Sequence, residues 1–282
     1  MSDSLLDRPI RELSFVAFDT ETTGLIPSSE RIVEVAAVKF RLDGEISVFD
    51  EMVDPGIPIP GAAARVHGIH DADVKGKPKI EDILPAFAEF LEGTIPLAHN
   101  AEFDIGFLAH EASRSGARFP RVPVLDTVEI SRSLRQDLPN HKLETISKAL
   151  DCPASTYHRA LADAQTLRDV FLRLTAELAD GTLRDLMSVV SGALTFGSDT
   201  RLNMWLPAHL KALEEAFESG GKVTIVYEPE GKRQDTREIT PRGWMRRQTA
   251  TFLMAHSERE NADRSYRLDW ITRAQYAQAT LF

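Results

Sequence analysis

The sequence predicts an α/β domain built on a mixed sheet, followed by a smaller β-rich domain. In the first part, three segments rich in Val, Ile and Phe precede an alternation of strands and helices, which is typical of a sheet covered by helices. In the second part, short alternating segments separated by turn residues indicate a small β-barrel. Charge separates the parts as well, because residues 1–180 carry 19 basic and 30 acidic side chains (net −11), whereas 181–282 carry 14 and 13 (net +1).

The elements of the first part follow from hydrophobic periodicity. Runs of β-branched and aromatic residues predict strands over 13–19, 31–40, 46–53, 95–98 and 122–125. Apolar positions at helical spacing predict helices over 81–92, 101–115, 142–150 and 159–179. The proline-rich and glycine-rich segment 54–80 is expected to be a long irregular excursion. Asn100 and Asp126 stand at helix-capping positions.

The second part begins after two further predicted helices, which join it to the first. These helices cover 183–190 and 207–218, and strands are expected over 222–227, 236–240, 249–255 and 266–271. The predicted organisation is a catalytic domain over 10–178, a helical connector over 179–220, a β-barrel over 221–274 and a C-terminal tail over 275–282.

Composition excludes several classes of protein. A net charge of −10 excludes a uniformly basic nucleic-acid coat. Cys152 is the only cysteine, so an intrachain disulfide and a thiolate zinc site are excluded and a reducing, cytoplasmic setting is expected. The first eight residues do not resemble a signal peptide, and the longest uncharged run, 186–198, is too short to span a bilayer. No membrane partner is expected.

Four carboxylates from three segments carry the chemical signal. Asp19 and Glu21 are two residues apart at the end of a strand and therefore project on one face. Asp104 opens one helix and Asp163 lies in the last long helix. Oxygen ligands without thiolates favour Mg²⁺ or Mn²⁺, and clustered carboxylates repel one another unless cations neutralise them. Two such ions suit an in-line displacement at phosphorus.

His158 is the candidate proton acceptor for the attacking water, because the ordinary pKa of histidine, about 6.5, lies near working pH. On a continuous helix, positions 158 and 163 would lie about 140° apart. His158 therefore acts beside Asp163 only if it sits in the loop before the helix.

Three motifs resemble those of the DEDD superfamily of exonucleases in its His variant: Asp19-x-Glu21, the segment His99 to Asp104, and His158-x-Ala-x-x-Asp163. The similarity covers about residues 12–176 and is greatest to the proofreading epsilon subunits of bacterial DNA polymerase III. It implies a ribonuclease H-like fold and 3′→5′ hydrolysis of nucleic acid, above all single-stranded DNA or 3′ ends, to nucleoside 5′-monophosphates with two Mg²⁺ or Mn²⁺ ions. DNA replication or repair is the implied setting.

Residue by residue, the resemblance gives metal-ligand roles to Asp19, Glu21, Asp104 and Asp163 and the general-base role to His158. The positions that hold the terminal nucleotide in relatives are Thr22, Leu25, His67 and Phe103. RNA remains an alternative substrate, because discrimination depends on reading the 2′-hydroxyl. A regulatory nucleic-acid-binding protein that uses this fold as a scaffold is the other alternative, although a scaffold needs neither the ligand set nor His158.

Residues 222–273 resemble a WYL domain, an SH3-like barrel that binds nucleic acid or nucleotide-like ligands in its family. The tripeptide that names the family is here Thr251-Phe252-Leu253. Arginines interleaved with aromatic residues, including Tyr266, favour phosphate contacts and base stacking, and the alternative is a barrel whose aromatics form its core. The candidate nucleic-acid-binding residues are Arg237, Arg242, Trp244, Arg246, Arg247 and Arg267.

The last five residues, Gln278 to Phe282, resemble the pentapeptide by which bacterial polymerases dock on the sliding clamp. Gln278, Leu281 and Phe282 match that motif, whereas Ala279 stands where the motif has leucine. The apolar pair at the end suits a pocket-filling anchor. A DNA polymerase and the clamp are therefore expected partners beside nucleic acid, and a tail folded back on its own barrel is the alternative.

Overall fold

The computed structural model describes residues 3–25, 27, 29–44, 46–120, 122–152, 158–190, 194–195, 207–231, 233–247 and 250–276. The chain divides into two compact units, residues 1–198 and 199–282. The segment 179–220, predicted to be a connector, contributes to both of them. The predicted domain boundaries stay a prediction.

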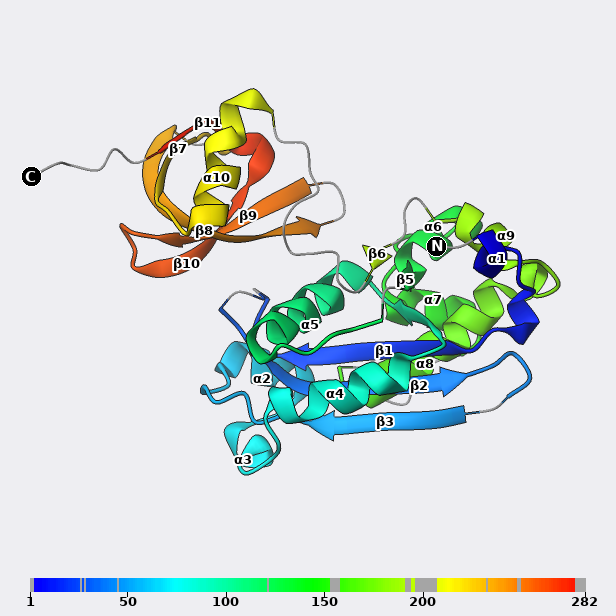
Figure 1. Ribbon diagram of the computed structural model, residues 1–282. Helices are drawn as coiled ribbons and strands as arrows, with labels where there is room; N and C mark the ends of the chain where they lie inside the picture. Colours follow the sequence, from blue (N-terminus) through cyan, green and yellow to red (C-terminus); the bar gives the residue numbers. More distant parts are fainter. Residues whose placement is uncertain are drawn as a thin grey trace, which may run out of the picture. The chain divides into compact units, whose positions relative to one another are not determined.

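A six-stranded mixed sheet with the order β3-β2-β1-β4-β5-β6 forms the centre of the first unit (Figure 1). The first three strands form an antiparallel meander, β4 and β5 continue parallel to β1, and β6 pairs antiparallel with β5. The strands are β1 (Phe15–Thr22), β2 (Ile32–Phe40), β3 (Ile46–Met52), β4 (Ile95–Ala98), β5 (Pro123–Asp126) and β6 (Leu194–Thr195). The predicted mixed α/β sheet is confirmed.

Helices cover both faces of this sheet. Alternate side chains of β1 face opposite layers: Val16 and Phe18 pack in one core, and Phe15 and Ala17 in the other. The first core is covered by α4 (Ile80–Leu91) and α5 (Ala101–Ser115). The second is covered by α6 (Thr127–Leu134), α7 (Leu143–Ala149), α8 (Ala160–Leu174) and α9 (Leu183–Ser188). Shorter elements are α1 (Asp3–Leu6) and the 3₁₀ helices η1 (Ile10–Glu12) and η2 (Ala176–Leu178).

The segment 54–80 is not irregular throughout, as the sequence had suggested. It contains α2 (Gly61–His67) and α3 (Asp71–Val74). Pro60 directly precedes α2, where a missing N–H costs no helical hydrogen bond, and Gly68 ends the helix with a left-handed φ of 73°. The prolines therefore mark a helix start as well as loops.

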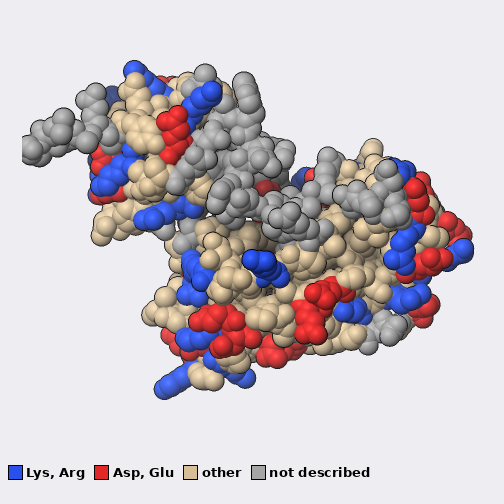
Figure 2. Space-filling model, viewed as in Figure 1, with Lys and Arg blue, Asp and Glu red and all other residues tan. Residues whose placement is uncertain are grey.

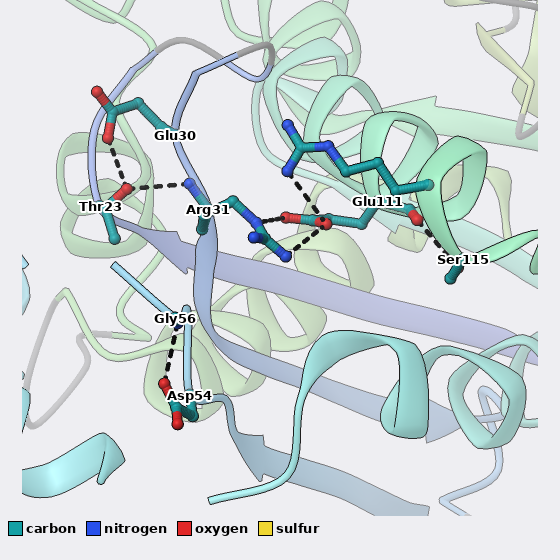
Figure 3. Close-up of polar contacts among 8 residues, drawn as sticks. Thr23, Glu30, Arg31, Asp54, Gly56, Glu111 and Ser115 are labelled. Atoms are coloured by element: carbon teal, nitrogen blue, oxygen red, sulfur yellow. Dashed lines mark hydrogen bonds and ion pairs between the residues drawn. The ribbon is translucent and has the colours of Figure 1, made fainter. Parts of the chain in front are cut away.

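An ion pair ties the start of β2 to α5. Arg31 Nε donates to Glu111 Oε1 at 2.7 Å and Arg31 Nη2 donates to Glu111 Oε2 at 3.2 Å. The Glu111 side chain is only 1% exposed. Figure 3 shows this pair, together with Thr23, whose hydroxyl accepts from the Arg31 N–H and donates to Glu30. The pair holds the start of β2 against α5, one of the covering helices.

The second unit is a five-stranded antiparallel sheet with the order β10-β9-β8-β7-β11. Its strands are β7 (Val223–Tyr227), β8 (Asp235–Arg247), β9 (Ala250–Ser257), β10 (Ala262–Arg267) and β11 (Ile271–Tyr276). Its helices are η3 (Ala208–Leu210), α10 (Lys211–Ser219) and η4 (Leu268–Trp270). Leu213 and Ala216 of α10 belong to the core of this unit, so α10 is part of the domain. Among the described residues the two outer strands do not pair, so the closed SH3-like barrel is not confirmed.

Surface charge is mixed. On the face shown in Figure 2, Lys and Arg side chains lie in small groups beside Asp and Glu. Within the described part of the chain, no helix combines the length and apolar character needed to cross a membrane.

Candidate active site

Three of the four predicted metal ligands come together at the end of β1. Asp19 and Glu21 lie on β1, and Asp163 lies in the first turn of α8. One carboxylate oxygen from each of the three lies within 4.8 Å of the others. Strand alternation places both β1 carboxylates on the face that α8 covers. The two-residue repeat of β1 therefore brings Asp19 and Glu21 to one face, and the packing of α8 on that face adds Asp163.

Asp104, the fourth predicted ligand, borders the cluster from α5. It is 2% exposed, and its Oδ1 accepts hydrogen bonds from the Thr20 N–H at 3.0 Å and the Thr20 hydroxyl at 2.7 Å. Thr20 belongs to the same strand as Asp19, but its side chain points to the opposite face of the sheet. Asp104 therefore approaches from the face that α5 covers, and its charge still acts on Asp19.

Asp126 fixes the start of α5 as well as that of α6. It accepts from the Val128 N–H at 2.9 Å, which confirms the predicted helix cap. It also accepts from the N–H groups of Asn100 at 3.0 Å and Ala101 at 3.2 Å. Asn100 adopts a left-handed φ of 63° at this turn. Asp126 thereby ties the end of β5 to the start of the helix that carries Asp104.

His158 lies in the turn directly before α8, at a left-handed φ of 63°. Its side chain is exposed, and its backbone N–H donates to Asp163 Oδ2 at 2.8 Å. The histidine therefore stands outside the helix, beside Asp163, as the spacing required. Asp163 Oδ1 is buried and has no hydrogen-bond partner among the described residues, so it remains an open acceptor in the cluster.

Sequence reasoning missed an ion pair next to this cluster. Glu34 of β2 lies opposite Glu21 in the strand register and is 1% exposed. Glu34 Oε1 accepts from Arg159 Nη2 at 2.7 Å, and its Oε2 accepts from the Ala160 N–H at 2.8 Å. The only signals in the sequence were a lone acid within an apolar strand and an arginine directly after the candidate histidine.

Burial makes the charged form of these carboxylates unfavourable. It raises the pKa of Glu21 to about 8, with the charge of Asp163 adding to the effect. It raises the pKa of Asp104 to about 7, against the hydrogen bonds from Thr20. The pKa of Asp19 lies well above its usual range, because of burial and then because of the charge on Asp104. Burial also raises the pKa of Asp163, although the His158 N–H opposes this. A divalent cation would remove the penalty.

The four predicted nucleotide-binding residues come from β1, the segment after it, α2 and α5. Thr22 is buried, Leu25 is 60% exposed and Phe103 is partly buried. His67 is 4% exposed, and its Nδ1 accepts from the Ile69 N–H at 3.0 Å. Its proton is therefore carried on Nε2, which has no hydrogen-bond partner in the described part of the chain. Their contact with a nucleotide stays a prediction.

Comparison with known proteins assigns the first unit to a family. The family model described as Exonuclease (RNase_T) matches residues 16–171, more than half of the chain. The chain belongs to the exonuclease family. The matched residues include the carboxylate cluster and His158. The model of the WYL domain matches residues 208–276, which identifies the second unit as a WYL domain.

Relatives of the exonuclease domain include components of DNA polymerase III. It is 37% identical over 180 residues to the DNA polymerase III PolC-type of Caldanaerobacter subterraneus subsp. tengcongensis, covering 64% of this chain and 13% of the relative. It is 41% identical over 182 residues to a DNA polymerase III subunit epsilon-like protein of Rhodobacter capsulatus, covering 62% of this chain and 25% of the relative. The chain thus spans an eighth to a quarter of the length of these curated relatives.

A solved structure of exonuclease I shows the same fold. Its TM-score is 0.53 at 18% identity, with 86% of this chain and 55% of that chain covered. This supports the ribonuclease H-like α/β fold expected from the sequence.

Two arginines of the WYL domain that were predicted to bind nucleic acid are engaged within the domain. Arg237 pairs with Asp235 at 3.1 Å, and its guanidinium lies 5.5 Å from the ring centre of Tyr266. Arg267 pairs with Asp269 at 2.8 Å. Tyr266 is 1% exposed and belongs to the core, so the expectation that it stacks on a base is wrong.

The remaining candidates of this part divide into two groups. The side chain of Arg242 is exposed. Outside the described residues lie the side chains of Trp244, Arg246 and Arg247 and the tail residues Gln278, Leu281 and Phe282. Nucleic-acid binding and clamp binding by these groups stay predictions.

Without divalent cations, we expect the thermal stability of the protein to fall as the pH rises from about 5 to about 8. Folding raises the pKa of Glu21 from 4.5 to about 8, so the stability that its bound proton contributes is complete below 4.5 and is lost as the pH rises through 8. Mn²⁺ at about 100 times its Kd should add about 2.7 kcal/mol, or roughly 5–10 °C in Tm.

Calorimetric scans of the full chain in EDTA and in Mn²⁺, from pH 5 to 8.5, measure this effect. Glu21→Gln removes one of the titrating groups and should flatten the decline in EDTA. If Tm in EDTA falls with pH as steeply in Glu21→Gln as in the wild type, Glu21 is not a group whose pKa folding raises.

Proposed function

We propose that this protein is a 3′→5′ exonuclease that removes nucleoside 5′-monophosphates from single-stranded DNA or DNA 3′ ends during replication or repair. The observation that carries the proposal is the convergence of Asp19, Glu21 and Asp163, with Asp104 at their border, in a domain of the exonuclease family. The names of relatives in DNA polymerase III support DNA as the substrate.

The cluster fits divalent cations of the hard class. Its donors are carboxylate oxygens, which Mg²⁺ and Mn²⁺ prefer, and Asp163 Oδ1 is a buried acceptor without a partner among the described residues. Asp19, Glu21, Asp104 and Asp163 would hold two such ions. Bound there, the ions would stabilise charge on the phosphate and lower the pKa of the attacking water.

His158 would accept the proton of that water. Its imidazole is exposed on the turn beside the cluster, and its backbone N–H holds Asp163 Oδ2. This hydrogen bond therefore holds one metal ligand against the backbone of the residue that carries the base, which suits a proton transfer that requires close placement. Thr22, Leu25, His67 and Phe103 would hold the terminal nucleotide.

The proposed partners follow from the rest of the chain. A DNA polymerase is proposed because the named relatives belong to DNA polymerase III, and a sliding clamp because of Gln278, Leu281 and Phe282. For the WYL domain we propose nucleic-acid binding, in which the exposed Arg242 is the described side chain best suited to a phosphate contact.

Digestion of 5′-labelled substrates tests the function directly. Single-stranded DNA, duplex DNA and RNA of one sequence are incubated with the full chain in Mg²⁺, Mn²⁺ or EDTA. We expect a ladder that shortens from the 3′ end, release of 5′-monophosphates and complete loss of activity in EDTA. Internal cuts, shortening from the 5′ end or activity in EDTA would contradict the proposal. Faster digestion of RNA than of DNA would favour the exoribonuclease alternative.

A further inference from the structure

We propose that the ion pair between Glu34 and Arg159 is a positioning device that sets His158 and Asp163 relative to the β1 carboxylates. The proposal rests on the proposed exonuclease function and assigns roles to two residues that neither the motifs nor the family match identify. Neither residue is itself a catalytic residue here, because both act through the start of α8.

The pair joins the central sheet to the beginning of α8. Arg159 donates to Glu34 through Nη2 at 2.7 Å and through Nε at 3.2 Å. Such a two-pronged contact fixes the plane of the guanidinium as well as its distance. Glu34 is 1% exposed and lies opposite Glu21 of β1 in the strand register. The contact therefore fixes the start of α8 relative to the β1 residues that carry the cluster.

Glu34 also supplies the cap that α8 lacks. Arg159 occupies the capping position, and its side chain makes no capping hydrogen bond. Glu34 Oε2 instead accepts from the Ala160 N–H at 2.8 Å. A carboxylate at this end is favoured both by the free N–H groups and by the helix dipole. One buried side chain thus holds the first residue of the helix and the residue before it.

The same turn holds the side chain of Asp163 and the backbone of His158. The Arg159 carbonyl accepts from the Asp163 N–H at 2.9 Å, and the His158 N–H donates to Asp163 Oδ2 at 2.8 Å. His158 has a left-handed φ of 63°. This conformation costs free energy and persists only where neighbouring contacts impose it. Loss of the pair would therefore release the base and the ligand together.

The chain contains a matched ion pair that serves as a control. Glu111 is also 1% exposed and also receives two hydrogen bonds from an arginine, Arg31 (Figure 3). It lies seven residues beyond Asp104 on α5, about 10 Å along the helix axis. Its loss should destabilise the same domain without moving the start of α8.

A double-mutant cycle separates positioning from stability. Glu34→Gln and Glu111→Gln are each made in the full chain, alone and combined with His158→Asn. The kcat and KM for a 5′-labelled oligonucleotide are measured at saturating Mn²⁺. We expect Glu34→Gln to lower kcat about 100-fold, because a small displacement of a catalytic group costs that much, with KM changed less than about threefold. Glu111→Gln should change kcat less than about threefold. Its Tm should fall by about as much as that of Glu34→Gln.

The decisive comparison is the His158→Asn background. There Glu34→Gln should cost about tenfold or less, because the imidazole that it positions is already absent and only the displacement of Asp163 remains. Equal losses in both backgrounds, or a folded Glu34→Gln protein with wild-type kcat, would overturn the proposal while leaving the exonuclease function intact. A raised KM with unchanged kcat would overturn it in favour of substrate contact by Arg159.

If the Glu34→Gln protein does not fold, Arg159→Lys takes its place in the double-mutant cycle. It keeps the charge but loses the two-pronged contact, and we expect a loss of about tenfold in kcat that is again smaller with His158→Asn. A wild-type rate in His158→Asn itself would overturn the proposed general base, and with it this role for Glu34. That result is distinguishable, because it appears before any change at Glu34 is made.

Discussion

Asp19→Asn should abolish the exonuclease activity and at the same time raise the thermal stability of the metal-free protein. Asp19 is the member of the cluster on which the charges of Asp104, Glu21 and Asp163 all act. The amide keeps the shape of the carboxyl group but cannot ionise in this buried, crowded site, which relieves the cost of burying and repelling a carboxylate there. The same change removes a ligand of the proposed cations, whose charge stabilisation is worth several kcal/mol, so a loss of roughly 10³-fold or more in kcat is expected.

The measurement pairs the oligonucleotide digestion with thermal melts in EDTA. Glu111→Gln is the control, because Glu111 is an equally buried acid of the same domain that is matched by Arg31. It should keep its activity and lose stability, which is the opposite pattern. An Asp19→Asn protein that digests DNA at the wild-type rate would refute the metal assignment. A Tm in EDTA below that of the wild type would refute repulsion between Asp19 and the other carboxylates of the cluster.

The local part of the fold could be predicted from the sequence because it depends on short-range periodicity. The two-residue repeat of β1 fixes which side chains face α8, and the turn before α8 follows from the distance between His158 and Asp163. The helices of 54–80 were missed because Pro60 was interpreted as a loop signal, although it precedes α2. Proline marks the first turn of a helix as readily as a loop.

The contacts that hold the site were not predictable, because they join residues far apart in the chain. Glu34 meets the Ala160 N–H across 126 positions, and nothing local distinguishes it from a surface acid. Asp126 could be predicted as a cap for α6 but not as an acceptor for Asn100, 26 positions away. The approach of Asp104 from the opposite face required knowledge of which helix covers which side of β1.

Charge counts were a poorer guide in the WYL domain. Arg237 and Arg267 were predicted to bind nucleic acid, whereas Asp235 and Asp269 lie against them. A net charge says how many charges remain in total but not which side chains are available to a phosphate. The proposed nucleic-acid binding by this domain would depend on cations without such partners, and the count alone could not identify them.

His158→Asn should lower kcat by about 10²–10⁴-fold, the usual contribution of a positioned general base. Asparagine is the sharper substitution than alanine, because His158 holds a φ of 63° and asparagine tolerates the left-handed region. The hydrogen bond from the residue 158 N–H to Asp163 Oδ2 can then persist, so the metal ligand stays in place while the imidazole is removed. His158→Ala adds backbone strain to the loss of the base, and a lower activity than that of His158→Asn would measure this strain.

The pH dependence of the residual activity identifies what His158 does. With the imidazole absent, hydroxide must replace the base, so log kcat should rise steadily with pH at saturating Mn²⁺, and more steeply than in the wild type, which supplies its own base. Mn²⁺ affinity measured by calorimetry should change little, because the cluster carboxylates are intact. A loss below tenfold, or a pH profile no steeper than that of the wild type, would assign the proton to another acceptor. A large loss of Mn²⁺ affinity would show instead that the turn at residue 158 acts through Asp163, since the His158 N–H is the hydrogen bond that links them.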